Sequence, residues 1–247
     1  MIAIEYAPDS FKLEETTVWS FPDRGKWATH SGKYRGNWTP YVPRNLILRY
    51  SAENAWILDQ FLGSGTTLIE AKLLGRNALG IDINPNSIKL SNQNLSFEAH
   101  GHSKILTKLG NARDLSFIKN ESMDMICTHP PYADIIRYSS SIEGDISHLA
   151  YDEFLEAMME VAAESYRVLK RGKICAFMIG DIRKRSYIRP LGMDTMKLFE
   201  EVGFQLKEIV VKKQHNCRST DYWKNKNKNF LMLEHEYVFV LEKNSIR

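Results

Sequence analysis

Residues 55–83 read AWILDQFLGSGTTLIEAKLLGRNALGIDI, and this stretch decides the fold. Residues 55–61 form an apolar run that predicts a buried strand, and residues 66–75 predict a helix that ends at a glycine. Residues 77–83 predict a second strand. A strand, a glycine-rich turn, a helix and another strand form the unit from which doubly wound parallel sheets are built.

The same alternation continues through the rest of the chain. Further strands are predicted at residues 104–112, 123–129 and 173–182, and further helices at residues 85–97, 151–172 and 190–203. The last two strands, 204–214 and 235–243, have no helix between them, so we expect an antiparallel hairpin at the edge of the sheet. The expected fold class is therefore α/β, with a doubly wound, mostly parallel sheet and an antiparallel C-terminal hairpin strand.

The composition is that of a globular protein and excludes few functions. Among 247 residues, 33 are Lys or Arg and 30 are Asp or Glu, so the net charge of +3 does not by itself indicate a polyanionic partner. The three cysteines form no CxxC pair, which argues against a disulfide framework and a metal site; Cys127 and Cys175 lie in apolar runs and are expected in the core. We find no signal peptide and no apolar run that could span a bilayer, so we expect a cytoplasmic protein without a membrane partner.

The turn at residues 61–67, FLGSGTT, lies where open α/β sheets bind ligands. Gly63 and Gly65 permit positive φ and close backbone approach, and Thr66 and Thr67 place free N–H groups at a helix N-terminus. Asp82 follows Gly65 by 17 residues, close to the roughly 20 expected of a carboxylate that binds ribose hydroxyls. A glycine turn alone is equally typical of a structural turn, and it is the spacing to Asp82 that favours a ligand site.

Asp59 indicates which nucleoside ligand fits this turn. Its carboxylate would repel a pyrophosphate, but it suits a ligand with an ammonium group. S-adenosylmethionine carries an ammonium, a carboxylate and a ribose, which match Asp59, the helix start at Thr66 and Thr67, and Asp82 in turn. The sequence therefore predicts S-adenosylmethionine as the cofactor.

A second candidate site is THPPY at residues 128–132, at the carboxyl end of a predicted strand and on the same edge of the sheet as the first site. Two consecutive prolines remove two N–H donors and stiffen the turn, so neighbouring carbonyls and side chains keep fixed directions. Tyr132 adds a flat face for stacking. Such a turn could hold a planar group that bears an amine.

The two motifs together carry a resemblance to a known family. FLGSGTT, Asp82, GNARDL at residues 110–115 and HPPY at residues 129–132 resemble the motif series of the S-adenosylmethionine-dependent amino-methyltransferases that modify cytosine N4 or adenine N6 in DNA. Residues 38–51, WTPYVPRNLILRYS, are similar to the family's element that closes over the methionine end of the cofactor. GDIRK at 180–184 and HEYVFVLEK at 235–243 resemble its last strands.

The resemblance implies a Rossmann-like methyltransferase fold and a set of site residues. The implied catalytic residues are His129, Pro130, Pro131 and Tyr132. The implied cofactor-binding residues are Thr39, Pro40, Pro43, Asp59, Phe61, Gly63, Gly65, Thr66, Thr67, Asp82, Ile83, Asn111 and Ala112. A base flipped out of the duplex would donate its amine to the side chain at position 129 and to the Pro130 carbonyl, with Tyr132 stacked on its ring and no covalent enzyme–base intermediate.

Three positions depart from the family's pattern. His129 stands where cytosine-N4 enzymes usually have Ser or Thr and adenine-N6 enzymes Asp or Asn, Gln60 replaces a proline, and Asn111 stands where an Asp often contacts the adenine. A neutral imidazole can accept one hydrogen bond. Cytosine N4 is favoured, while adenine N6, an RNA base and a non-catalytic nucleic-acid-binding subunit remain alternatives.

The expected partner is double-stranded DNA, and a cognate restriction endonuclease would be a further partner in a restriction–modification system. The small net charge hides an uneven distribution of charged residues along the chain, because residues 143–164 hold seven acids and no Lys or Arg. Basic residues mixed with aromatic ones elsewhere suit phosphates and stacking, with a solvated basic face as the alternative. The candidate nucleic-acid contacts are Arg24, Lys26, Lys33, Arg35, Lys184, Arg185, Arg189, Lys213, Arg218, Trp223 and Lys224. We expect an N-terminal extension at residues 1–37 and a methyltransferase domain at 38–247, with small recognition insertions at about 133–150 and 212–234.

Overall fold

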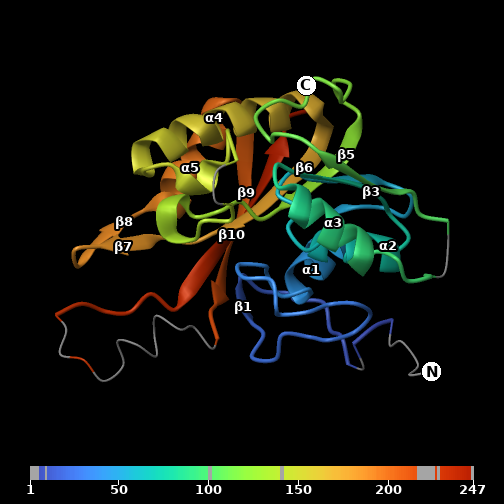
Figure 1. Cartoon of the computed structure of the whole chain (residues 1–247), viewed down its shortest axis with the longest axis horizontal. Helices are drawn as coiled ribbons and strands as arrows, with labels where there is room; N and C mark the ends of the chain where they lie inside the picture. The colour runs from blue at the N-terminus through green and yellow to red at the C-terminus, as the bar shows by residue number, and fades with distance from the viewer. Residues whose placement is uncertain are drawn as a thin grey trace.

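The computed structural model describes residues 6–8, 10–99, 102–139, 142–215, 226 and 229–245. An eight-stranded sheet with the strand order β1-β9-β10-β6-β5-β2-β3-β4 runs through its centre (Figure 1). The strands of this sheet are β1 (Val18–Ser20), β2 (Trp56–Asp59), β3 (Asn77–Asp82), β4 (Ile105–Leu109), β5 (Met123–Thr128), β6 (Leu169–Ile179), β9 (Phe204–Lys213) and β10 (His235–Lys243). A separate antiparallel pair joins β7 (Ile182–Lys184) to β8 (Tyr187–Arg189).

The pairing of the strands confirms the predicted fold class. Strands β4, β3, β2, β5 and β6 form one parallel ladder, and β1 pairs with β9 in parallel. β10 is antiparallel to both β6 and β9. The sheet is thus mostly parallel, with an antiparallel C-terminal strand.

Helices cover both faces of the sheet (Figure 1). They are α1 (Tyr41–Tyr50), α2 (Thr66–Leu73), α3 (Pro85–Asn94), α4 (Tyr151–Val168) and α5 (Leu191–Glu201), together with the 3-10 turns η1 (Ala133–Ile135) and η2 (Ile146–His148). The first three helices pack over one face, and α4 and α5 pack against each other and over the other face. The layered arrangement follows from the alternating sequence, since each helix buries its apolar stripe against the sheet.

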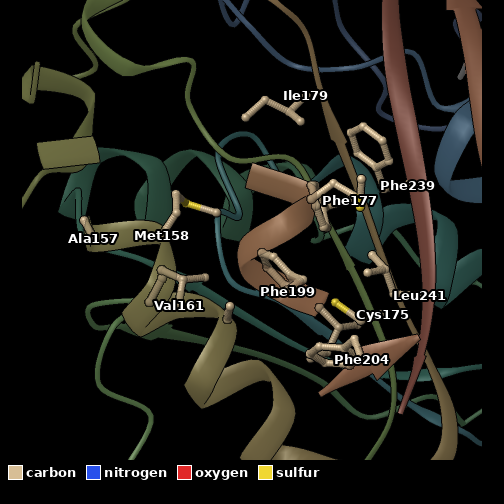
Figure 2. Close-up of a cluster of buried hydrophobic side chains, with 14 of the residues drawn as sticks. Ala157, Met158, Val161, Cys175, Phe177, Ile179, Phe199, Phe204, Phe239 and Leu241 are labelled. Atoms are coloured by element: carbon tan, nitrogen blue, oxygen red, sulfur yellow. The ribbon is translucent and has the colours of Figure 1, made fainter. Parts of the chain in front are cut away.

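Each face of the sheet has its own apolar core. Figure 2 shows the core on the α4 and α5 side, where side chains of β6, β10 and both helices converge. The rings of Phe177 and Phe199 lie 4.5 Å apart between centroids, within the range of favourable aromatic pairs. Cys175 belongs to this core and Cys127 to the one on the opposite face; both are fully buried free thiols, which confirms their predicted core role.

The structure corrects two features of the prediction. The helix predicted at 151–172 ends at Val168, because the Val168 carbonyl accepts a bond from the backbone N–H of Ser122 (2.9 Å) and Leu169 pairs with Met123, so the chain enters β6 without a loop. The predicted C-terminal hairpin does not form the edge of the sheet, since β1 pairs outside β9. β1 is only three residues long and gives no periodic signal.

Two further elements were absent from the prediction. Residues 41–50 form helix α1 although Pro43 lies in its first turn, where a missing N–H costs nothing. The β7–β8 hairpin turns at Arg185 and Ser186, both with positive φ, which is rare for such residues. β1 brings part of the predicted extension 1–37 into the sheet, and the domain boundary at residue 37 stays a prediction. Within the described residues, no helix combines the length and apolarity needed to cross a bilayer.

Candidate active site

A cavity lies at the carboxyl ends of β2, β3 and β5 and encloses about 810 Å³ including its mouth. The predicted residues that line it are Asp59, Phe61, Gly63, Thr66, Asp82, Ile83, Asn111, Ala112, His129 and Pro131. Parallel strands end at the same edge of a sheet, so side chains distant in the sequence meet there. The structure thus brings most of the predicted cofactor-binding residues together with part of HPPY.

The glycine-rich turn forms the floor of this cavity. Gly63 and Gly65 have φ angles of +52° and +88°, the left-handed region that glycine tolerates best. A Cβ on Gly63 would lie 3.2 Å from the ring of Tyr34, so the turn passes close under that aromatic side chain. The turn ends at Thr66, where α2 begins and its first N–H groups remain unpaired within the helix. These N–H groups can receive an anionic ligand group.

Asp82 closes the turn and faces the cavity. Its Oδ2 accepts from the Gly63 backbone N–H (2.8 Å) and its Oδ1 from the Asn84 backbone N–H (2.8 Å). Burial raises the pKa of this carboxyl, and the two backbone bonds act in the opposite direction. A carboxylate oxygen has more than one acceptor direction, so each can also accept a ribose hydroxyl. Asp82 therefore fits the role that its spacing predicts.

Asp59 at the end of β2 is 2% exposed, and its buried carboxylate favours a ligand that brings a positive charge. Its Oδ1 accepts from the Thr128 hydroxyl (2.7 Å) and from the Phe61 backbone N–H (3.1 Å). Burial raises the pKa of Asp59 to about 6, although these hydrogen bonds lower it. A bound ammonium group would favour the ionised form. This electrostatic requirement, together with the acceptors of Asp82, fits S-adenosylmethionine.

Apolar side chains also line the cavity and suit a flat ring; they are Ile83, Ala112, Ile146 and Val161. A Cβ on Gly144 would lie only 3.1 Å from Asn111 Nδ2, so a larger residue at position 144 would crowd Asn111. The Oδ1 of Asn111 already accepts the backbone N–H of Arg113 (3.0 Å), which sets the orientation of its amide.

Some predicted cofactor residues do not line the cavity. Gly65 and Thr67 lie at the N-cap and in the first turn of α2, and Thr39, Pro40 and Pro43 lie at and before the first turn of α1. Thr39 instead donates its hydroxyl to the Arg24 carbonyl (2.6 Å). The side chains that enter from this part of the chain are Tyr34, Asn37 and Trp38.

A second cavity of about 1500 Å³, including its mouth, opens beside the first. Gly36, His129 and Tyr138 line both. The second cavity is also lined by Tyr132, by Asp181 and Arg183 near β7, and by His235 and Glu236 of β10. HPPY therefore lies at the junction, with Pro131 on the first side and Tyr132 on the second.

Hydrogen bonds link the catalytic candidates to β10. His129 Nε2 lies 3.0 Å from the Tyr132 hydroxyl, which donates to Glu236 Oε1 (2.7 Å). Glu236 Oε2 in turn accepts from Lys212 Nζ (2.9 Å). Burial lowers the pKa of His129 to about 4, so the imidazole is neutral at physiological pH. The indole of Trp38 is stacked on that imidazole, with centroids 5.4 Å apart and planes 19° from parallel.

The candidate nucleic-acid contacts divide into three groups. The exposed ones are Lys26, Lys33, Arg35, Lys184, Arg185, Arg189 and Lys213, and Arg35 also lines the second cavity. Arg24 turns inward, because its guanidinium donates to the carbonyls of Asn37 and Trp38. Arg218, Trp223 and Lys224 lie outside the described residues.

Several lining residues had no role in the sequence prediction. Tyr34 was predicted only as an aromatic residue among basic ones, and Trp38 also as the first residue of the 38–51 segment, whereas Tyr138, Asp145 and Glu236 received no individual role. Glu236 had one available signal: it is an acidic residue directly before the apolar run at 237–241 of a predicted strand. The predicted recognition insertion at 133–150 supplies Tyr138, Gly144 and Asp145 to the cofactor cavity.

Comparisons with known proteins agree with this geometry. A family model described as DNA methylase matches residues 4–93 and 123–247, and one described as an RMKL-like methyltransferase domain matches residues 49–175. The chain is 33% identical over 143 residues to a tRNA (guanine(10)-N2)-dimethyltransferase of Methanothermobacter thermautotrophicus, covering 58% of this chain and 38% of that protein. It is 41% identical over 71 residues to the type II methyltransferase M2.LlaDCHI of Lactococcus lactis subsp. cremoris, covering 29% and 25%.

These matches span well under half the length of both curated relatives. A solved S-adenosylmethionine-dependent methyltransferase of Methanosarcina mazei has the same fold, with a TM-score of 0.58 and 19% identity over 81% of this chain and 97% of that one. Because the DNA methylase match extends over most of the sequence, this protein belongs to the DNA methylase family of S-adenosylmethionine-dependent methyltransferases.

Proposed function

We propose that this chain methylates the exocyclic amine of a base flipped out of double-stranded DNA, with cytosine N4 as the favoured acceptor. The observation that carries the proposal is the junction at His129, which lines both the cofactor cavity and the second cavity. A base in the second cavity would bring its amine to the boundary with the cofactor. Its edge would then meet HPPY and its ring the face of Tyr132, as base-flipping enzymes require.

The chain's own residues would bind the cofactor, orient the target base and exclude water. Asp82, Asp59 and the N–H groups at Thr66 would hold S-adenosylmethionine, which when bound supplies a methyl group activated by a sulfonium. The neutral His129 would accept a hydrogen bond from the target amine, and the Pro130 carbonyl would accept the other. Two acceptors in fixed directions would localise the nitrogen lone pair toward the cofactor side. Trp38, stacked on His129, would keep water from the junction.

An RNA base is the second candidate acceptor. It is favoured by the match to the tRNA (guanine(10)-N2)-dimethyltransferase, which covers more of this chain than the type II methyltransferase match does. Guanine N2, cytosine N4 and adenine N6 are all exocyclic amines, so the same acceptors could serve each of them. Adenine N6 in DNA is the remaining alternative.

The surface around the second cavity supports a nucleic-acid partner. Arg35 and Arg183 line that cavity. Exposed Lys184, Arg185 and Lys213 lie on β7, on the turn after it, and at the end of β9. Such residues contact phosphates and position the strand without reading its sequence. We further propose that residues 133–150 and 212–234 contribute to target recognition, and that the enzyme belongs to a restriction–modification system.

Methyl transfer to defined substrates tests the proposal. The purified chain, supplied with labelled S-adenosylmethionine, is offered duplex DNA and, separately, tRNA, and the modified nucleoside is identified by mass spectrometry. We expect N4-methylcytosine from DNA, and the variant His129→Ala should lose the product while still binding the cofactor. Modified tRNA without modified DNA would favour the second candidate, and no transfer to either substrate would refute the proposal.

A further inference from the structure

An ion pair between a buried glutamate and a mostly buried lysine lies beside the second cavity, on the neighbouring strands β10 and β9. Glu236 of β10 is 8% exposed and is the cross-strand partner of Lys212 on β9, with Oε2 and Nζ 2.9 Å apart. The interior positions that follow on β10, Val238 and Phe239, are apolar. Removing two charges from water is costly, and an apolar pair of similar volume is often at least as stable. Stability alone therefore does not explain why a carboxylate stands here.

The charge state of Glu236 determines what its second oxygen can do. Burial opposes ionisation, but the charge of Lys212 and the hydrogen bonds from Lys212 and Tyr132 outweigh it, so the pKa of Glu236 lies below its ordinary value. At neutral pH the group is thus a carboxylate, which only accepts hydrogen bonds. Burial and the nearby carboxylate raise the pKa of Tyr132, so the phenol keeps its hydrogen and donates it to Oε1.

This donation sets the direction of the next hydrogen bond. A phenol has a single hydrogen, and Tyr132 directs it to Glu236, so toward His129 its oxygen can only accept. His129 Nε2 lies 3.0 Å from that oxygen and must therefore carry the hydrogen. A neutral imidazole has one N–H, which leaves Nδ1 with a free lone pair. Within the described part of the chain, no hydrogen bond to Nδ1 is found, and Trp38 holds the plane of the ring by stacking.

We infer that Glu236 is a positioning residue: acting through Tyr132, it selects the Nε2–H tautomer of His129 and so keeps Nδ1 as the acceptor for the target amine. The inference deepens the proposed function and rests on it for the role of Nδ1. In the opposite tautomer, Nδ1–H would face an amine N–H, donor against donor. His129 can therefore replace the usual acceptor side chain only while its tautomer is selected.

The tautomer can be measured in the free protein, without any substrate. Histidine rings of the full-length ¹⁵N-labelled chain are observed by long-range ¹H–¹⁵N correlation, and the His129 signals are assigned as those lost in His129→Gln. We expect a protonated Nε2 and an unprotonated Nδ1 in the wild-type chain. In Glu236→Gln the amide can donate to the phenol oxygen and turn the phenol hydrogen toward Nε2, so the Nδ1–H form should become the major one.

Glu242→Gln is the matched control, because Glu242 lies on the same strand and its Oε2 also pairs with a lysine, Lys207, at 2.9 Å. This variant should leave the tautomer unchanged. Tyr132→Phe cuts the relay without removing the charge of Glu236, so it should also release the tautomer. If Glu236→Gln fails to fold, Tyr132→Phe decides whether the relay selects the tautomer of His129.

Kinetics give an independent readout. We expect kcat to fall about 10- to 100-fold in Glu236→Gln, the scale for partners that orient a functional histidine, while the dissociation constant of S-adenosylmethionine stays unchanged. Glu236→Gln added to Tyr132→Phe should cause little further loss, because both variants cut the same relay.

A wild-type chain with Nδ1–H, or a Glu236→Gln chain with an unchanged tautomer, would overturn the inference even if activity falls. A wild-type chain that methylates no nucleic acid would instead refute the proposed function, and the tautomer measurement would still decide whether the relay exists.

Discussion

Glu70 is the residue on which the position of the N-terminal segment depends. It lies on α2, directly after the glycine-rich turn, and is fully buried. Its Oε1 accepts from the Trp27 indole and contacts His30 Nε2, both at 2.7 Å, and its Oε2 accepts from Arg44 at 2.8 Å. One carboxylate thus joins helix α1 and the segment before it to helix α2.

Glu70→Gln should destabilise the fold strongly. The amide has only one oxygen, so its NH₂ group must face either the Arg44 guanidinium or the donors of Trp27 and His30, and the buried arginine loses its counter-charge. Breaking a buried pair in this way costs about 3–5 kcal/mol. For a chain of this length about 2–4 °C are lost per kcal/mol, so the melting temperature should fall by about 6–20 °C.

Denaturant and thermal unfolding followed by circular dichroism measure this effect, with Glu200→Gln on the exposed face of α5 as the control. Such a surface change should shift the free energy of unfolding by about 0.5 kcal/mol at most. Glu70→Gln should also weaken cofactor binding, because the N-terminal segment that it releases supplies Tyr34, Asn37 and Trp38 to the cavity. A loss of stability below about 1 kcal/mol for Glu70→Gln would refute the reasoning.

Three further predictions concern the cavities. Asp82→Asn turns an amide N–H toward the backbone N–H of Gly63 or Asn84. The loss of one charge-assisted hydrogen bond should lower the affinity for S-adenosylmethionine, measured by calorimetry, about 10- to 100-fold. An unchanged affinity would contradict this prediction. The pKa of Asp59 is raised to about 6 in the free protein, so protonation weakens binding of the cofactor ammonium as the pH falls through 6. Binding should release protons between about pH 4 and 6, and Asp59→Asn should remove that release. Gly180→Ala places a Cβ 3.2 Å from the Tyr132 ring, so kcat should fall by about 10-fold at unchanged cofactor affinity; an equal fall in affinity would place the effect elsewhere.

The raised pKa of Asp59 also determines how the stability of the protein changes with pH. Its folded value lies above its ordinary value, so the free folded protein binds this proton more tightly than the unfolded chain does. The corresponding contribution to stability is present at low pH and is lost as the pH rises through about 6. Bound cofactor should weaken this trend, because the ammonium favours the ionised carboxylate and lowers the pKa of Asp59 toward its ordinary value.

The parts of the site that were predicted from the sequence are local. Gly63, Gly65 and Asp82 belong to one strand–turn–helix–strand unit, whose spacing follows from backbone geometry, and HPPY is a continuous motif. Glu236 is 104 residues from its partner Tyr132, and only the strand order β10-β6-β5 brings the two together. A pattern along the chain carries no signal for such a contact.

The aromatic residues near the N-terminus show a second limit of prediction from the sequence. Mixed with Arg24 and Lys26, they matched the composition of a nucleic-acid surface, but Trp27 and Trp38 are buried at 3% and 4% exposure. Composition does not reveal which side of a segment without periodicity faces the core. Here the burial of Trp27 follows from a specific partner, Glu70, that lies 43 residues further along the chain.

The segment before α1 physically connects the cofactor turn to the catalytic motif. Asn37 Nδ2 donates to the Ser64 hydroxyl within the glycine-rich turn (2.9 Å), while the next residue, Trp38, is stacked on His129. Arg24 holds both residues by donating to their carbonyls. A shift of the turn on cofactor binding would therefore move Asn37 and, through the adjoining backbone, the indole that fixes the plane of the imidazole. Because the imidazole of His129 also lines the second cavity, two consecutive residues, Asn37 and Trp38, form a short physical connection between the cofactor turn and the proposed acceptor for the target amine.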